Sequence, residues 1–180
     1  MRNKVRLACF LFVLLGLSSL HSIEAPVASE KINWISLEEA LVLNKNNPKH
    51  FLIDLYTDWC GWCKVMDRET YSEQDIADFI NENFYAIKFN AEQKEPVTLN
   101  EHTFKFIPSG RRGYHELAAA LTKNQLTYPN TVFLTSDFQV LQAIAGYLKP
   151  AQMKPIIKYM GEGHYTKTPW EDFSKSFTSL

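Results

Sequence analysis

The chain has 180 residues, of which 46% are hydrophobic and 22% are charged, with only 7 Gly and 8 Pro. These proportions exclude a fibrous or intrinsically disordered protein and predict one globular domain. The formal net charge of -1 at pH 7 provides no basic field of the kind that binds nucleic acid or an anionic membrane surface.

The first 25 residues have the pattern of a secretory signal peptide. Basic residues precede an apolar run over residues 7–20, which is shorter than the roughly 20 residues that a membrane-spanning helix needs. We therefore expect cleavage between residues 22 and 29 and export to the periplasm or the cell exterior. The mature domain would then extend over residues 30–180.

The first predicted elements are a helix and a buried strand. Ser36, with Glu39 three residues later, is a typical helix N-cap, and the apolar positions that follow predict an amphipathic helix over residues 33–47. An apolar run over residues 51–56, interrupted only by Asp54, predicts a strand that is buried on both faces of a sheet.

A strand-helix-strand unit is predicted next. The segment WCGWCK follows the first strand directly and begins a helix that extends to about Thr70. A second helix starts with Ser72 as its N-cap, and residues 85–90 form the next strand. The connection in such a unit is right-handed when its two strands are parallel.

The second half of the chain is expected to complete the sheet. Alternating residues over 97–107 predict an inserted hairpin. A helix is expected over residues 114–121, starting with Tyr114. Residues 131–135 and 140–145 form two strands that a short turn joins, so they are expected to pair antiparallel.

Two helices are expected to close the chain. Residues 153–160 are amphipathic, with Pro155 either at the start of the helix or at a bend. A short helix capped by Thr168 then docks on the body of the domain. Together the elements predict a single α/β domain, in which a central mixed sheet is flanked by helices and a hairpin and a helix are inserted over residues 92–125.

Cys60 and Cys63 are the residues with the clearest chemistry, because Cys9 lies in the segment that cleavage would remove. A Cys-x-x-Cys pair at a strand-to-helix junction sets its first sulfur where the helix dipole stabilises a thiolate, so Cys60 is the expected nucleophile. Cys63 lies one turn later and can resolve a mixed disulfide on Cys60. A zinc half-site, which needs further ligands, and a purely structural disulfide, which would close a very short loop, stay open as alternatives.

The run FLIDLYTDWCGWCK resembles the active-site segment of the thioredoxin superfamily, an aromatic-rich strand that ends in Trp-Cys-x-x-Cys-Lys. Asp54, six residues before the first cysteine, matches the buried carboxylate of that family, and Lys88 matches the lysine of its next strand. Tyr128 and Pro129 fall where the family has a cis-proline. Gly146 matches a glycine near the family's active site.

This resemblance covers residues 32–161 and implies a thioredoxin fold, with Cys60, Cys63 and Asp54 as catalytic residues and Lys88 in a supporting role. A desolvated Asp54 would have a raised pKa and would exchange a proton with Cys63. An extended peptide substrate would bind in a groove beside the sulfurs. The residues expected to form this groove are Trp59, Gly61, Trp62, Tyr128, Pro129 and Gly146.

The implied activity is thiol-disulfide exchange on protein disulfides by a reductase or isomerase that needs no organic cofactor and no metal. Such a protein must be reduced again after each cycle in an oxidising compartment, so a membrane-embedded electron donor is the expected partner. A monomer is expected, with no nucleic acid partner. The 92–125 insertion and Trp62, which replaces a proline of small thioredoxins, leave the redox direction open. The alternatives are a disulfide-forming oxidase and a non-catalytic metal-binding or chaperone-like protein.

Overall fold

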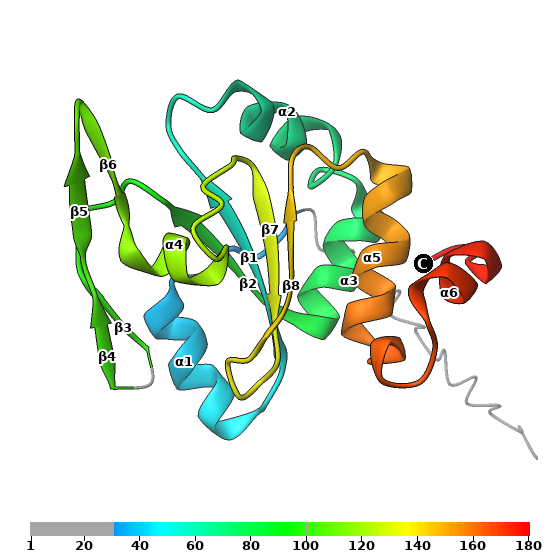
Figure 1. Ribbon diagram of the computed structural model, residues 1–180. Coiled ribbons are helices and arrows are strands. Elements are labelled where there is room, and N and C mark those ends of the chain that lie inside the picture. Colours follow the sequence, from blue (N-terminus) through cyan, green and yellow to red (C-terminus); the bar gives the residue numbers. More distant parts are fainter. Residues whose placement is uncertain (1–30, 100) are drawn as a thin grey trace, which may run out of the picture.

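The fold is organised around a mixed β-sheet (Figure 1). The computed structural model describes residues 31–99 and 101–180, and within them this main sheet has four strands in the order β2-β1-β7-β8. β1 (His50–Tyr56) runs parallel to β2 (Phe84–Asn90) and antiparallel to β7 (Asn130–Leu134), which pairs antiparallel with β8 (Val140–Ala145). The predicted fold class is confirmed.

The N-terminal predictions concern residues that lie outside this description. They are the signal peptide over residues 1–25, the cleavage range of 22–29 and the position of Cys9. Among the described residues, no helix has both the length and the hydropathy that are needed to cross a membrane.

Helices cover both faces of the main sheet. α3 (Gln74–Asn83) and α5 (Pro150–Gly161) pack on one face, and α1 (Leu37–Asn46) and α4 (Glu116–Leu121) pack on the other (Figure 1). Successive residues of β1 point to opposite faces: Leu52 joins the cluster under α3 and α5, whereas Phe51 and Ile53 join the cluster under α1 and α4. Both faces of β1 are therefore buried, as its apolar run predicts.

The helix starts agree only in part with the sequence pattern. Ser36 caps α1 as expected, because its Oγ accepts a hydrogen bond of 3.1 Å from the N–H of Glu39. Ser72 does not cap α3, because its hydroxyl donates to the carbonyl of Arg68 instead, and Glu73 is the N-cap residue.

The two C-terminal helices start at other residues than expected. Pro150 is at the start of α5 and Pro155 lies inside the helix, so the first of the two expected positions for Pro155 is excluded. A 3-10 turn, η1 (His164–Thr166), precedes α6 (Trp170–Ser176). Pro169 is the N-cap residue of α6, and the predicted cap Thr168 instead accepts a hydrogen bond from Tyr159 Oη at its backbone carbonyl.

The insertion contains a second hairpin that the sequence pattern did not predict. β3 (Val97–Leu99) and β4 (His102–Phe104) form the predicted hairpin, but β5 (Phe106–Ser109) and β6 (Arg112–His115) form another. The prediction of Tyr114 as a helical residue is wrong, because Tyr114 lies in β6 and pairs with Ile107. Its spacing of three from Leu117 matches a helix only by coincidence.

His115 fixes this insertion to the body of the domain. The side chain is fully buried, Nδ1 accepts from the N–H of Leu117 at 3.2 Å, and Nε2 lies 3.1 Å from the carbonyl oxygen of Glu95. Because Nδ1 accepts, the proton of the neutral ring is on Nε2 and is donated to Glu95. Burial lowers the pKa of this imidazole, which agrees with a neutral ring. The backbone N–H of His115 also donates to Ala91 at 2.7 Å.

His115→Ala should therefore destabilise the protein. The change removes the cap of α4 and leaves the Leu117 N–H and the Glu95 carbonyl without their partner, so we expect the free energy of unfolding to fall by about 2–4 kcal/mol in urea titrations. His115→Asn keeps a side-chain acceptor for a helix cap and should lose less. A loss below about 0.5 kcal/mol for the alanine variant, the range of ordinary surface substitutions, would contradict this role.

Candidate active site

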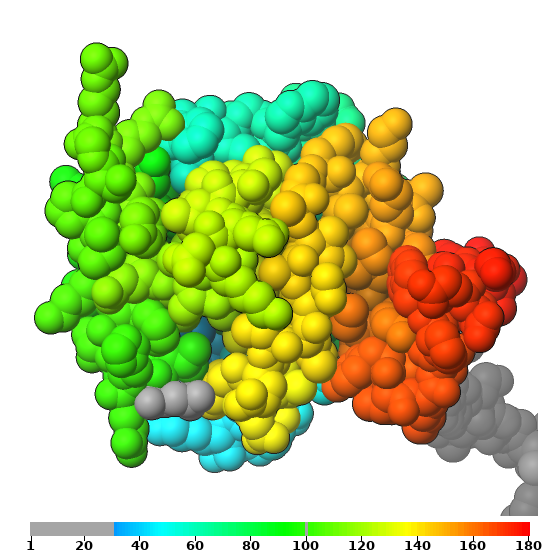
Figure 2. Space-filling model, in the orientation of Figure 1, coloured from blue at the N-terminus to red at the C-terminus, as the bar shows by residue number. Residues whose placement is uncertain are grey.

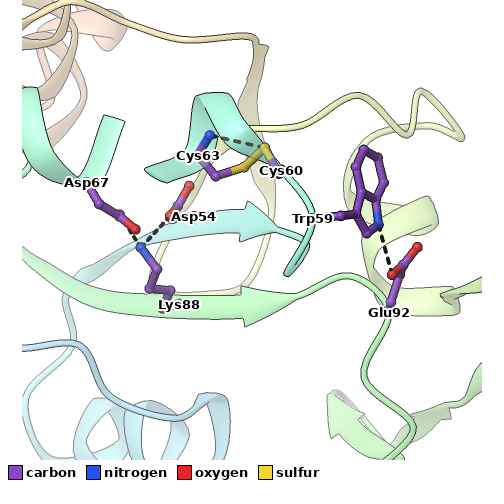
Figure 3. The surroundings of a disulfide bond; sticks show 7 residues. All are labelled: Asp54, Trp59, Cys60, Cys63, Asp67, Lys88 and Glu92. Carbon is purple, nitrogen blue, oxygen red and sulfur yellow. Dashed lines mark hydrogen bonds and ion pairs between the residues drawn. A yellow bond between two sulfur atoms is a disulfide. The ribbon is translucent and has the colours of Figure 1, made fainter. Parts of the chain in front are cut away.

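The two cysteines lie at the start of α2 (Gly61–Glu69), which follows β1 after a short segment over residues 57–59, and they are joined by a disulfide bond. Both are buried, with exposed fractions of 4% for Cys60 and 3% for Cys63. Cys60 is the N-cap residue of α2, and its Sγ accepts a hydrogen bond of 3.1 Å from the N–H of Cys63 (Figure 3). The first N–H groups of a helix and its dipole favour negative charge, so this position stabilises a thiolate on Cys60.

Asp54 and Lys88 are brought together beneath the disulfide by strand register (Figure 3). Asp54 lies two residues after Leu52 in β1 and shares its face of the sheet. Lys88 is the register partner of Asp54 on β2, and its Nζ lies 3.1 Å from Asp54 Oδ2. Asp54 is only 1% exposed. Its Oδ1 has no hydrogen-bond partner within residues 31–99 and 101–180.

Asp67 completes this ion-pair network and was not found from the sequence. Its carboxylate accepts a hydrogen bond from Lys88 Nζ, so the ammonium lies between two carboxylates (Figure 3). Asp67 is four residues after Cys63 on α2, and this helical spacing is the signal that could have located it. Lys88 Nζ also lies 5.0–5.8 Å from the centroids of three aromatic rings, those of Trp34, Tyr56 and Tyr71.

The pKa values of the buried Asp54 and the partly buried Lys88 are both raised. Burial raises the pKa of Asp54 to about 6, although the ammonium of Lys88 acts in the opposite direction. Burial by itself would lower the pKa of Lys88, but Asp54 and Asp67 outweigh it, and the net shift is upward. Lys88 therefore stays charged, while Asp54 is a carboxylate near neutral pH that can still take up a proton.

An apolar hollow of about 300 Å³ lies beside the cysteines. It is lined by Trp62, Tyr128, Pro129 and Gly146, all of them predicted, and by Tyr147, which was not. Trp62 is 62% exposed and stacks on Tyr147 with 5.6 Å between the ring centroids. The Tyr128–Pro129 bond is cis, and the N–H of Gly146, a residue with a φ of 96°, donates to the Pro129 carbonyl at 2.8 Å.

Trp59 and Gly61 do not line this apolar hollow. The Trp59 ring contacts Tyr128 edge-on with 6.2 Å between centroids, and its Nε1 donates to Glu92 Oε2 at 3.0 Å (Figure 3). Arg112 of the insertion lies over the same ring, with its Cζ 4.3 Å from the centroid. A Cβ at Gly61 would have no atom within 4 Å, so packing does not require glycine there.

The sequence offered little to reveal the additional site residues. Tyr147 is an aromatic residue directly after Gly146, which is a weak signal, and Glu92 and Arg112 carry none. No group of three or more His, Cys, Asp or Glu side chains in the described part of the chain is placed to hold a metal ion.

Comparison with known proteins identifies the family. The family model Thioredox_DsbH, described as "Protein of unknown function, DUF255", matches residues 22–172. The chain belongs to this family. It is 27% identical over 152 residues to "Uncharacterized protein B0495.5" of Caenorhabditis elegans, a match that covers 83% of this chain but only 18% of that protein.

Solved structures are similar in fold to this Thioredox_DsbH-family chain. A "DsbH Oxidoreductase" has 18% identity and a TM-score of 0.50, over 85% of this chain and 91% of that one. A thioredoxin from Thermus thermophilus has 17% identity and a TM-score of 0.53, over 77% of this chain and 99% of that one. The expected thioredoxin fold and superfamily are confirmed.

Asp54→Asn should stabilise the oxidised Thioredox_DsbH-family protein at neutral pH. The carboxyl holds its proton up to a pKa of about 6 in the fold, against 3.8 as the ordinary value. The contribution of Asp54 to wild-type stability is therefore greatest below the ordinary pKa and is lost as the pH rises through about 6. We expect the variant to be more stable by up to about 3 kcal/mol above this range, and by much less near pH 3 to 4.

Urea titrations of both proteins across this pH range measure the difference. Asp137→Asn, a change at an exposed aspartate between β7 and β8, is the matched control and should follow the wild type at every pH. If Asp54→Asn is less stable than the wild type at pH 7, the buried carboxylate contributes more through its pair with Lys88 than its desolvation costs.

Proposed function

We propose that this protein is a thiol-disulfide oxidoreductase that reduces or isomerises disulfide bonds in protein clients. The observation that carries the proposal is the position of Cys60 at the N-cap of α2, above a buried carboxylate whose pKa is raised to about 6. Such a site combines a stabilised thiolate with a proton acceptor for the second thiol.

The first proposed step is nucleophilic attack by the reduced protein. The Cys60 thiolate attacks one sulfur of the client disulfide, forms a Cys60–client disulfide, and expels the other client sulfur as a thiolate, which takes a proton from water. The hydrogen bond from the Cys63 N–H to Cys60 Sγ supports the thiolate before attack.

Cys63 resolves this intermediate in the second step. Its thiol gives a proton to Asp54, and the sulfur attacks Cys60 Sγ, which forms the Cys60–Cys63 disulfide and expels the remaining client thiolate. Lys88 stays charged and stabilises the Asp54 carboxylate between turnovers. The client disulfide gains two electrons and two protons in total. The protein loses two electrons and the Cys63 proton, which passes from Asp54 to the second expelled thiolate, and the other proton comes from water.

The proposed mechanism also implies the cofactor requirement, the compartment and the electron donor of the protein. The cysteine pair carries the electrons, so the reaction needs no organic cofactor and no metal. Export, as residues 1–25 predict, would put the protein in an oxidising compartment. There the pair must be reduced after each cycle, and a membrane protein that presents a reduced dithiol on its outer side is the proposed donor. The protein is proposed to act as a monomer.

The roles of the cysteines can be tested by trapping. Cys63→Ala removes the resolving thiol, so reduced Cys63→Ala protein should accumulate client proteins as mixed disulfides on Cys60. Non-reducing electrophoresis followed by mass spectrometry of the linked peptides measures this accumulation. Cys60→Ala is the matched control and should trap little, and more trapping by that variant would reverse the two roles.

The reduction potential of the cysteine pair tests the direction of the reaction. A strong oxidant needs an over-stabilised thiolate, but Gly61 and Trp62 bring no positive charge between the cysteines, and Lys64 is exposed and screened. The negative charge of Asp54 disfavours the thiolate and so favours the disulfide over the dithiol. We expect a potential of roughly -200 mV or below in glutathione equilibration.

A higher reduction potential than expected would change the proposed direction of the reaction. A potential near about -120 mV, the range of strong periplasmic oxidants, would support a disulfide-forming oxidase instead. Asp54→Asn should move the potential upward if the carboxylate acts as argued. An unchanged potential in that variant would remove Asp54 from the control of direction.

A further inference from the structure

The hairpin of β5 and β6 reaches the residue next to the reactive cysteine. In Figure 1 its tip lies at the same end of the molecule as α2, and in Figure 2 the green insertion forms one flank beside the cyan segment that contains α2. The contact is made by Arg112, which stacks on Trp59 with its Cζ 4.3 Å from the ring centroid. Trp59 directly precedes Cys60, so the insertion borders the site at which a client would react.

The hairpin is built to hold its tip in one position. Ser109 pairs with Arg112 across a turn made by Gly110, with a φ of 57°, and Arg111. Gly113 lies beneath the ring of Phe106, where a Cβ would come within 2.2 Å of a ring carbon. The ring thus covers the glycine next to the arginines. At its base, His115 fixes β6 to the domain as described above.

A cationic hollow of about 310 Å³ opens between this hairpin and the segment after β2. We call it the arginine hollow; it is lined by Glu92, Lys94, Phe106, Arg111, Arg112 and Gly113. Glu92 is the one carboxylate among these residues, and its Oε2 already accepts the indole N–H of Trp59. Within the described part of the chain, the side chains of Lys94, Arg111 and Arg112 form no ion pair with a carboxylate, so the arginine hollow has an excess of positive charge.

The geometry of Arg112 leaves it ready to bind an anion. A guanidinium that stacks on an aromatic ring uses its flat face, and the N–H groups in its plane remain free to donate to a carboxylate in a bidentate pair. Arg111, one residue away at the tip, adds a second cation. An extended client chain advances roughly 3.3 Å per residue, so positions within a few residues of a client cysteine at Cys60 come into reach of the arginine hollow.

We propose that the arginine hollow binds acidic side chains of the client segment that flanks the reacting disulfide, which makes the protein selective for clients with Asp or Glu near the attacked cysteine. The inference rests on the proposed function. The arginine hollow differs from the apolar hollow of Trp62 and Tyr147, which offers aromatic stacking but no charge. The two hollows give the site an apolar surface and a cationic one, so a client is recognised by both properties.

Rates of exchange with defined peptides test this selectivity. Two peptides each carry one cysteine as a mixed disulfide with 2-mercaptoethanol, and they differ only in having Glu or Lys at the positions around the cysteine. The reduced protein should react about three- to tenfold faster with the Glu peptide, the effect expected of partly exposed ion pairs. The preference should fall towards unity as the ionic strength rises from about 0.01 M to about 1 M, where the Debye length shortens from about 30 Å to about 3 Å.

Substitutions at Arg111 and Arg112 test whether these residues cause the preference for the Glu peptide. Arg111→Gln/Arg112→Gln should remove most of the Glu-over-Lys ratio, and Arg111→Glu/Arg112→Glu should invert it. Lys45→Gln/Lys175→Gln, which removes the same charge from exposed positions on α1 and α6, is the matched control and should keep the wild-type ratio. A ratio near unity in the wild type at low salt, or one that survives Arg111→Gln/Arg112→Gln, overturns the inference.

The uncharged bis(2-hydroxyethyl) disulfide separates this inference from the proposed function. If the reduced wild type exchanges with this reagent but does not discriminate between the peptides, the inference fails and the proposed function stands. If it exchanges with none of the three disulfides, both fail. The salt dependence of the wild-type ratio needs no substitution, so the test does not depend on the folding of any variant.

Discussion

A buried carboxylate beneath the cysteine pair is the constraint on which the site depends. Asp54 is 1% exposed on the central strand β1, where an ionised group loses its hydration. The structure compensates with one cation, Lys88, supplied by the parallel register of β1 and β2, and Asp67 of α2 then holds that cation from the other side. The compensation is incomplete, which is why burial still raises the pKa of Asp54 to about 6. If nearby cations compensated the Asp54 charge completely, its pKa would stay near the ordinary value, and the carboxylate would be a poor proton acceptor near neutral pH.

The same network joins α2 to the two strands β1 and β2. Asp67 and Cys63 lie on one face of α2, and Asp54 and Lys88 lie on the two strands below it, so the helix that carries the sulfurs is tied to the sheet that carries the base. The aromatic rings around Lys88 add apolar cover and favourable contact with the ammonium. The helices that cover both faces of the sheet exclude water from this charged centre, which is the origin of the desolvation of Asp54.

The insertion and the fold core contribute different parts of the client-binding surface. Tyr128, Pro129 and Gly146 belong to segments at the ends of β7 and β8, which are fixed by the main sheet, and with Trp62 and Tyr147 they form an apolar hollow. The arginine hollow belongs to β5, β6 and the segment after β2, and its position depends on His115. Trp59 lies between the two hollows, because its ring contacts Tyr128 of the apolar hollow edge-on and Arg112 of the arginine hollow lies over its face.

The sequence by itself determined the elements with strong periodicity and the residues that local spacing defines. The buried strand β1, the Ser36 cap of α1, the antiparallel strands β7 and β8, and the positions of Cys60, Cys63 and Asp54 all follow from patterns within a few residues of one another. Only the tertiary structure decided that Asp67 binds Lys88, that Tyr147 stacks on Trp62, and that a second hairpin brings Arg112 onto Trp59. Tyr114 shows why: a spacing of three residues fits a helix and a hairpin end equally well, and the pairing with Ile107 that settles it is a contact between two segments. Contacts of this kind depend on how elements pack, and no local pattern encodes them.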